Sequence, residues 1–210
     1  LSITKKGYIK KTNLMAYSNV RSSGIIGLKL DPDDVLIGSA LTRDGDDILI
    51  GTKMGKAIRF KESDVRAMGR ASRGVTGIRF SEQDDEVIGV EVLKTGAEAT
   101  ILSVCENGFG KRTPTSEYRV QSRGGKGIYT IKVTDRNGPV IGLCQVAQED
   151  HMMIMTSAGK IMRFKVREIG VIGRLTQGVR LINLEQGERI ISLDRVPAEE
   201  GGDEESDGDA

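Results

Sequence analysis

Residues 48–60 read Ile48-Leu-Ile-Gly-Thr-Lys-Met-Gly-Lys-Ala-Ile-Arg-Phe60, and this stretch decides the fold class. Two apolar runs flank a short polar link that contains Gly55. The pattern predicts a strand, a tight turn and a second strand, because glycine reaches the positive φ of such turns at little cost. Two further strands are expected at 74–80 and 86–93, and no segment shows a 3.6-residue apolar stripe over three turns.

The same landmarks recur four times in the same order. A glycine followed four residues later by a base occurs at Gly7–Lys11, Gly55–Arg59, Gly108–Arg112 and Gly159–Arg163. Glycine doublets then open an apolar strand at 24–27, 74–77 and 124–127, with a weaker copy at Gly178. Four strands in each unit of about 50 residues are typical of propeller-like folds. We therefore expect an all-β body over residues 1–196, built from four-stranded blades at about 1–44, 46–93, 99–146 and 150–196.

Charge follows the same period. Residues 199–210 hold seven acidic and no basic side chains, which predicts a disordered acidic tail at 197–210. This tail is either a solubilising end or a nucleic-acid mimic that competes for the protein's own basic surface. The rest of the chain has 31 basic and 23 acidic residues, a net charge of +8, and the bases concentrate in the first half of each unit. Units stacked side by side would then form a basic band, which is typical of nucleic-acid binding.

Strand alternation predicts where these bases point. Ile58 and Phe60 share one face of their strand, and Arg59 and Lys61 share the other. The strand that contains Arg163 and Lys165 repeats the pattern. Since Lys11, Arg59, Arg112 and Arg163 occupy one slot of the repeat, we expect all four to point outward. The glycine doublets suit both tight turns and a close approach of the backbone to phosphates.

Other functions have little support. The apolar runs reach at most five residues, far below the ~20 that span a bilayer. The two cysteines, Cys105 and Cys144, fit neither a metal site nor a disulfide framework and suit a reducing cytosol. The chain has a single histidine, His151, for which we expect a structural role. A Ser-His-Asp triad, which needs a histidine as its general base, therefore has little support. A free-standing enzyme is the least favoured class, and the chain, which begins inside a patterned segment, is expected to be part of a longer protein.

The run Gln121-Ser-Arg-Gly-Gly-Lys-Gly127 resembles the C-terminal domain family of the DNA gyrase A protein, and segments 7–12, 70–75 and 173–178 extend the likeness over the body. The resemblance implies a β-pinwheel, a propeller-like ring whose blades exchange strands and whose rim binds and bends DNA. Wrapping would let ATP-dependent strand passage by the parent topoisomerase produce negative supercoils. The catalytic tyrosine of the family belongs to another region, so no catalytic role is assigned to Tyr8, Tyr17, Tyr118 or Tyr129.

The family's box motif, Gln-basic-Arg-Gly-Gly-basic-Gly, is matched at 121–127 except at Ser122. Because the family carries its strict box in the first of about six blades, this run is either the functional box or a copy in a later blade. The predicted DNA-binding residues are Lys10, Lys11, Arg59, Lys61, Arg73, Lys111, Arg112, Arg119, Gln121, Arg123, Gly124, Gly125, Lys126, Gly127, Arg163 and Lys165.

The resemblance also implies the partners of the chain. These are double-stranded DNA, the N-terminal region of the gyrase A protein and the gyrase B protein, in the bacterial cytoplasm at the nucleoid and without a membrane. No cofactor is expected in this chain, since the parent enzyme uses ATP and Mg²⁺ elsewhere. Two alternatives stay open: the related C-terminal domain of the topoisomerase IV A protein, and a propeller scaffold whose basic band binds an acidic protein.

Overall fold

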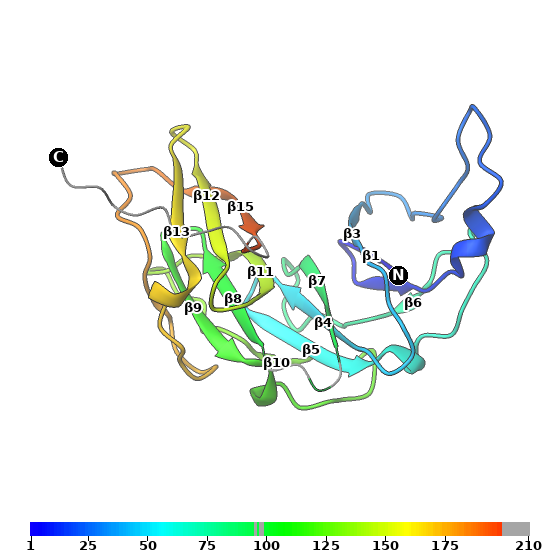
Figure 1. The fold of residues 1–210 in the computed structure, drawn as a ribbon, viewed down its shortest axis with the longest axis horizontal. Helices are drawn as coiled ribbons and strands as arrows, with labels where there is room; N and C mark the ends of the chain where they lie inside the picture. The colour runs from blue at the N-terminus through cyan, green and yellow to red at the C-terminus, as the bar shows by residue number, and fades with distance from the viewer. Residues whose placement is uncertain (95, 97–98, 199–210) are drawn as a thin grey trace.

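Four small β-sheets follow one another along an arc in the computed structural model, which describes residues 1–94, 96 and 99–198 (Figure 1). The strands are β1 (Ser2–Thr4), β2 (Tyr8–Lys10), β3 (Leu36–Ser39), β4 (Asp47–Thr52), β5 (Lys56–Lys61), β6 (Val75–Thr76), β7 (Val87–Leu93), β8 (Thr100–Cys105), β9 (Phe109–Pro114), β10 (Ile128–Tyr129), β11 (Val140–Val146), β12 (His151–Thr156), β13 (Ile161–Lys165), β14 (Val179–Arg180) and β15 (Ile190–Val196). Short 3-10 turns are η1 (Leu14–Tyr17), η2 (Glu62–Asp64), η3 (Thr115–Glu117) and η4 (Val166–Glu168). The predicted all-β, four-bladed propeller-like fold is confirmed, whereas the predicted acidic tail lies outside the described residues from 199 onward.

Each of the first three sheets takes its outermost strand from the following repeat. The sheet orders are β3-β1-β2-β6, β10-β5-β4-β7 and β11-β8-β9-β14. Thus β6 pairs with β2, β10 with β5 and β14 with β9, all antiparallel. We call residues 24–30, 74–80, 127–133 and 178–184 the exchange segments of repeats one to four. The strand exchange implied by the family resemblance is therefore present.

The exchange segments differ in two ways from the sequence prediction. The strand expected at 74–80 shrinks to Val75–Thr76, because the N–H groups of Gly77 and Arg79 bond instead to the carbonyls of Gly7 (2.7 Å) and Gly125 (2.9 Å). In the third repeat the position of Gly74 is taken by Gly127 rather than Gly124. Both Gly74 and Gly127 have positive φ, and a Cβ on either would lie 2.5–2.6 Å from a carbonyl oxygen of the preceding sheet.

The fourth sheet has three strands in the described part of the chain, in the order β13-β12-β15, so the prediction of four strands in every blade is wrong here. The physical reason is the exchange, since a fourth strand would come from a following repeat. At the other end of the arc, exchange segment 24–30 forms no strand, and a Cβ on Gly24 would meet nothing within 4 Å. Within the described residues, β13 therefore has no outer neighbour and segment 24–30 joins no sheet.

The core fills the space between neighbouring blades. Inner strands β3, β7, β11 and β15 contact one another in series. One apolar cluster joins blades one and two through residues such as Ile3 and Ile48, and another joins blades three and four through residues such as Leu102 and Ile154. Burial of these β-branched and leucine side chains between blades is the main stabilising term. It also explains why alternation of apolar and polar residues was visible in the sequence.

We expect Gly55→Ala to destabilise the fold more than Gly159→Ala by at least about 1–3 kcal/mol, the usual cost of overpacking. Both glycines occupy the same turn of the repeat, with φ of 77° and 79°. A Cβ on Gly55 would lie 2.3 Å from the Ile131 carbonyl oxygen, whereas a Cβ on Gly159 would meet nothing within 4 Å. Urea unfolding of the two variants measures the difference, and equal losses would contradict the account of the exchange seat.

A polar pocket of about 390 Å³ lies between β7, β11 and β15 and contains Glu91. Burial raises the pKa of Glu91 to about 7, against a smaller lowering by a backbone hydrogen bond from Gln145 and by the charge of Arg195. Asp194 also lines this pocket, and burial together with the charges of Asp150 and Asp194 raises the pKa of Cys144, another lining residue. Between pH 4.5 and about pH 7, the folded state therefore holds a proton on Glu91 that the unfolded chain has already released.

The raised pKa of Glu91 determines how the free energy of unfolding changes with pH. Because the folded-state pKa of Glu91 is raised, its stabilising contribution is complete below about 4.5 and is lost as pH rises through about 7. Glu91→Gln, which mimics the protonated form, is expected to gain stability relative to the unaltered chain between pH 5 and pH 8, with no further gain above pH 8. A difference in unfolding free energy that stays constant with pH would contradict the burial of this carboxyl group.

Candidate nucleic-acid interface

In the first three repeats, the base that follows the turn glycine by four residues faces the next repeat, not the solvent. Lys11 Nζ lies 2.6 Å from Glu62 Oε1 at the start of η2. Arg59 Nη1 donates to the carbonyls of Thr115 (2.9 Å) and Tyr118 (3.2 Å) around η3. Arg112 Nε donates to the carbonyl of Ile169 (2.8 Å), directly after η4. We call Lys11, Arg59 and Arg112 the latch residues, because each fastens its blade to the next repeat.

The prediction that this slot points outward is therefore wrong for the latch residues. Strand alternation does place Arg59 opposite Ile58 and Phe60, which are fully buried. The face that carries Arg59 is covered by the turn of the following repeat, and Asp47 lies 2.6 Å from its guanidinium. Arg163 has no following repeat within the described residues, so it stays exposed and donates to His151 Nδ1 at 2.9 Å.

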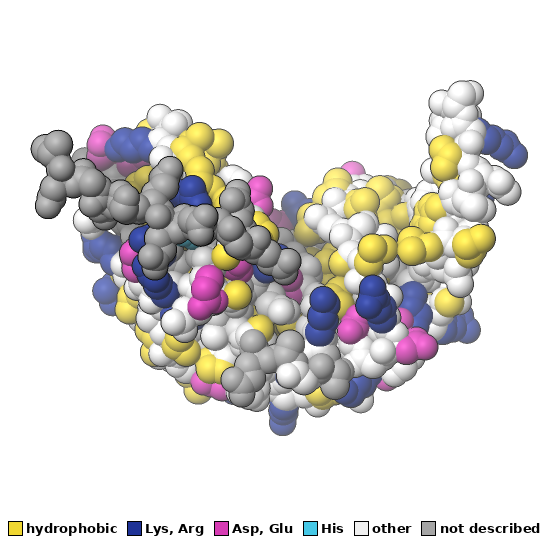
Figure 2. All heavy atoms as spheres, viewed as in Figure 1, with side chains coloured by type: hydrophobic (Ala, Val, Ile, Leu, Met, Phe, Trp, Pro, Cys, Tyr) yellow, Lys and Arg dark blue, Asp and Glu magenta, His cyan; other side chains and the backbone are white. Residues whose placement is uncertain are grey.

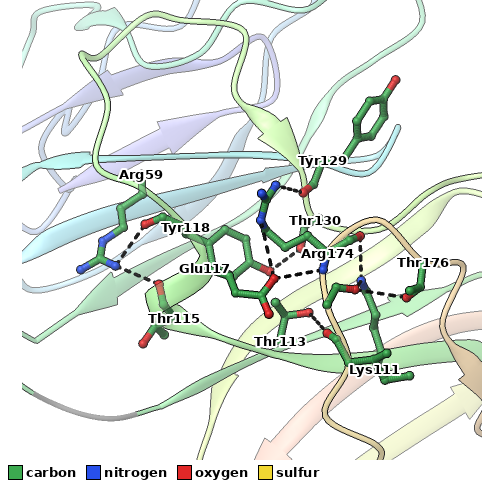
Figure 3. Close-up of polar contacts among 12 residues, drawn as sticks. Arg59, Lys111, Thr113, Thr115, Glu117, Tyr118, Tyr129, Thr130, Arg174 and Thr176 are labelled. Carbon is green, nitrogen blue, oxygen red and sulfur yellow. Dashed lines mark hydrogen bonds and ion pairs between the residues drawn. The ribbon is translucent and has the colours of Figure 1, made fainter.

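Two further predicted contacts, Lys10 and Lys111, are 1% and 0% exposed. Lys111 Nζ donates to the carbonyls of Gly173 (2.5 Å) and Arg174 (2.8 Å), as Figure 3 shows. Lys10 Nζ bonds in the same way to the carbonyls of Gly27 and Arg70. Burial lowers the pKa of Lys111 to about 8. Contrary to the prediction that they contact DNA, these two lysines are inaccessible: a loop of the next repeat closes over Lys111, and Arg70 of the next repeat closes over Lys10 together with Gly27 of its own repeat.

The arginine of the box motif is also part of the scaffold. Arg123 donates from Nη1 to the Thr76 carbonyl and from Nε to the Asp64 carbonyl (3.1 Å). The equivalent arginines also donate to a carbonyl of the preceding exchange segment. Arg70 Nη1 donates to the Ile26 carbonyl (3.2 Å), and Arg174 Nη1 donates to the Tyr129 carbonyl (2.9 Å), the latter shown in Figure 3. We call Arg70, Arg123 and Arg174 the seam arginines, and each contact between an exchange segment and the next repeat a seam. The first, second and third seams join repeats 1–2, 2–3 and 3–4.

The glycines of the box lie against protein backbone. The N–H of Gly124 donates to the Gly77 carbonyl (2.8 Å), and the carbonyl of Gly125 accepts from Arg79 (2.9 Å). Gly127 rests on the Ala57 carbonyl, and the N–H of Gln121 donates to the Arg59 carbonyl (2.7 Å). Their close backbone approach therefore serves the second seam. A role for these residues in binding DNA stays a prediction.

A different slot of the repeat points outward. Lys29, Arg79 and Lys132 each stand between two apolar residues near the end of an exchange segment. Their backbone N–H groups donate across the seam to Ser72 (3.2 Å), Gly125 (2.9 Å) and Thr176 (2.9 Å) respectively. Their side chains are exposed, and none makes a hydrogen bond or ion pair with another described residue. We call these three the rim cations; the fourth repeat has the neutral Asn183 in this slot.

The sequence prediction missed the rim cations, although a signal was present. The triplets Leu28-Lys-Leu30, Ile78-Arg-Phe80 and Ile131-Lys-Val133 share an apolar–basic–apolar pattern at a fixed distance after the glycine. That pattern recurs as regularly as the turn glycines. The triplet pattern alone does not show that its middle side chain points outward, because that direction is determined by the backbone hydrogen bond across the seam.

The other predicted cations are accessible. Arg73 and Lys126 precede the equivalent glycines Gly74 and Gly127, and both are exposed. Lys61, Arg119 and Lys165 are exposed as well, with Lys61 lying 3.0 Å from Asp47. Figure 2 shows Lys and Arg side chains at several places along the convex lower edge of the arc.

Aromatic rings hold Arg73 and three cations outside the predicted set, Lys56, Arg136 and Arg180, in place. The guanidinium of Arg73 lies 3.9 Å from the centre of the Tyr8 ring, and Lys56 Nζ lies 5.1 Å from that of Tyr129. In the third blade, Arg136 and Arg180 lie 4.8 and 5.2 Å from the centre of the Phe109 ring. A cation above a ring face keeps its other side open to a ligand. The outer rim thus presents pre-positioned positive charge on three successive blades.

The family model described as DNA gyrase C-terminal domain, beta-propeller, matches residues 1–43, 46–94, 100–143 and 150–197, one match for each blade. The chain belongs to the DNA gyrase C-terminal domain family. The DNA gyrase A protein of Salmonella typhimurium is 46% identical over 204 residues, which are 97% of this chain and 23% of that protein. The gyrase A protein of Deinococcus deserti is 41% identical over 191 residues, 90% of this chain and 24% of the relative. The chain therefore spans about a quarter of the length of these curated relatives.

Solved structures support the same fold for this member of the DNA gyrase C-terminal domain family. A DNA gyrase A C-terminal domain aligns with a TM-score of 0.81 at 23% identity, over 93% of this chain and 64% of that one. The C-terminal domain of DNA topoisomerase IV aligns with a TM-score of 0.88 at 26% identity, over 94% and 61%. In the described residues, no helix is long and apolar enough to cross a membrane. No cluster of three His, Cys, Asp or Glu side chains suited to a metal was found among those residues either.

Proposed function

We propose that this chain binds duplex DNA along its outer rim and bends it without reading base sequence. The observation that carries the proposal is the recurrence of the rim cations at three successive seams, with no acidic partner among the described residues. DNA carries one charge per about 1.7 Å of axis, and each phosphate neutralised by Lys or Arg releases counterions. A curved row of such cations binds phosphates and makes no contact that depends on base identity.

Several phosphate contacts together can offset the free energy needed to bend DNA. Bending 20–30 base pairs by 40–90° costs on the order of 1–6 kcal/mol. One phosphate contact contributes about 0.9 of a tenfold step in affinity at 0.1 M salt, or about 1.2 kcal/mol. The three rim cations together with Arg73 and Lys126 would therefore offset the cost of a moderate bend. The curvature of the arc gives the bend its direction.

Within the parent enzyme, this domain would wrap a DNA segment so that ATP-dependent strand passage introduces negative supercoils. Its partners would be double-stranded DNA, the remainder of the gyrase A protein, and the gyrase B protein, in the bacterial cytoplasm at the nucleoid. The chain itself would supply no catalytic residue and need no cofactor, with ATP and Mg²⁺ used elsewhere in the parent. The names of the relatives support this assignment.

A topology assay tests the proposal. A nicked plasmid is relaxed, incubated with the chain and religated, and the linking number is read after the protein is removed. Wrapping is expected to shift the linking number in proportion to bound protein. A topoisomerase IV-type domain, which the TM-score of 0.88 keeps as the second candidate, would bind DNA with little shift. Binding without any shift would contradict wrapping, and absence of salt-dependent binding would favour the protein scaffold instead.

A further inference from the structure

The second seam contains an open groove of about 490 Å³ where three repeats meet. Tyr8 comes from the first repeat, Arg73 and Arg79 come from the second, and Arg123 comes from the third. The lining holds three guanidinium groups and no carboxylate. An acidic contact comes from Asp31, which lies outside the lining and 3.0 Å from Arg73 Nε. The groove therefore carries an excess of positive charge and suits an anion.

Two of the three guanidinium groups are held in place without a ligand. Arg73 lies over the Tyr8 ring at 3.9 Å and is bound by Asp31. Arg123 is held by the carbonyls of Asp64 and Thr76. The Arg79 backbone is fixed by its bond to Gly125, while its side chain is exposed and has no partner among the described residues. Groups that are already ordered lose little conformational entropy when they bind an anion.

The equivalent places at the other seams are different. The first seam has Ser23, Lys29 and Arg70. The third has Lys126, Lys132 and Arg174, and Glu117 Oε2 lies 3.8 Å from Arg174 Nε (Figure 3). Arginine presents a planar fork that binds two phosphate oxygens at once, whereas lysine acts as a point charge. Among the seams described, the second is the one built from three arginines.

We propose that the second-seam groove is a phosphodiester seat, with Arg79 closing on a DNA phosphate between the fixed Arg73 and Arg123. The seat makes the strongest single contact of the bound duplex and fixes where its path crosses the rim. This inference rests on the proposed function, since the phosphate belongs to the wrapped duplex. The same chemistry could also take free phosphate, and the test separates the two sources.

The test compares Arg79→Gln with Lys132→Gln, which remove one charge from the same slot of neighbouring repeats. Lys132→Gln is expected to weaken binding of a 30-base-pair duplex about 8-fold at 0.1 M salt, the effect of one lost phosphate contact. Arg79→Gln is expected to weaken it roughly 60-fold, because a bidentate guanidinium–phosphate pair makes two charge-assisted hydrogen bonds where lysine acts as a single point charge. Arg79→Lys keeps the charge and is expected to fall between. Unchanged thermal unfolding of the three variants checks that the fold is kept.

Nuclear magnetic resonance signals of arginine Nε–H groups identify the ligand. A 12-base-pair duplex is expected to shift the signals of Arg73, Arg79 and Arg123 more than that of Arg174, and inorganic phosphate at the same phosphate concentration is expected to shift them less. If the unaltered chain binds duplex and Arg79→Gln and Lys132→Gln weaken that binding equally, the phosphodiester seat is overturned but the proposed function stands. Larger shifts with inorganic phosphate than with duplex would assign the groove to a free anion and also overturn it. Failure of the unaltered chain to bind any duplex would remove both.

Discussion

Replacing Lys29, Arg79 and Lys132 together by Gln is expected to weaken duplex binding at least about 500-fold at 0.1 M salt. Each lost phosphate contact removes about 0.9 from the slope of log K against log salt, so the slope becomes shallower by about 2.7. The three side chains are exposed and make no hydrogen bond or ion pair with another described residue, so their loss leaves the seams intact. Fluorescence anisotropy of a labelled duplex over 0.05–0.3 M salt measures both quantities.

A matched control separates rim position from total charge. Arg43, Lys53 and Arg189 lie in loops beside the inner strands, and replacing these three by Gln removes the same net charge. Lys53 and Arg189 each lie 3.4 Å from a carboxylate, that of Glu86 and Glu106, so thermal unfolding of the control checks that these losses leave the fold intact. We expect the control to bind within about 5-fold of the unaltered chain, since screening at 0.1 M salt limits their influence to about 10 Å. Equal losses in the two triple variants would show that binding follows net charge and would remove the rim cations from the account.

Arg59→Met is expected to destabilise the fold by about 1–3 kcal/mol, the usual cost of leaving buried acceptors without their hydrogen-bond donor. The substitution takes the guanidinium from Asp47, which keeps Lys61 as a partner, and leaves the carbonyls of Thr115 and Tyr118 without this donor. The blade then loses a fastening to the next repeat. Equilibrium unfolding in urea measures the change.

Arg163→Met provides the control, because Arg163 occupies the same slot in the fourth repeat. It is exposed and bonds to His151 alone among the described side chains, so its loss is expected to cost less than about 1 kcal/mol. If Arg59→Met left stability unchanged but reduced DNA binding, the slot would be the contact surface that the sequence pattern predicted, and the latch would be wrong.

Much of the fold could be predicted from the sequence because each repeat encodes its own sheet. Alternation in segments such as Ala57–Phe60 and the turn glycines determine local pairing, and both appear within a few residues. The exchange of the outermost strand is not visible in this way. It depends on contacts between residues 66–73 apart, such as Tyr8 with Thr76, and no local pattern specifies them.

The site was predicted less well, and the reason is specific. Alternation shows which face of a strand is opposite to the core, but not whether another repeat covers that face. Lys111 and Arg112 are buried by loops from more than 50 residues away, and Lys10 is buried by such a loop together with Gly27 of its own repeat; all of these offer carbonyl groups to the cations. A recurring base was therefore interpreted as a ligand contact when its recurrence reflects a recurring joint between blades.

The measurement that tests the central claim most directly is the end-to-end distance of a 40-base-pair duplex, labelled with donor and acceptor dyes at its ends, on the chain. We expect saturating protein to bring the ends together, with a transfer efficiency that falls as salt rises and that returns to the free-duplex value when Lys29, Arg79 and Lys132 are replaced by Gln. A duplex that binds and stays straight, or that bends equally on the triple variant, would contradict the claim that outward cations at successive seams hold DNA along the arc.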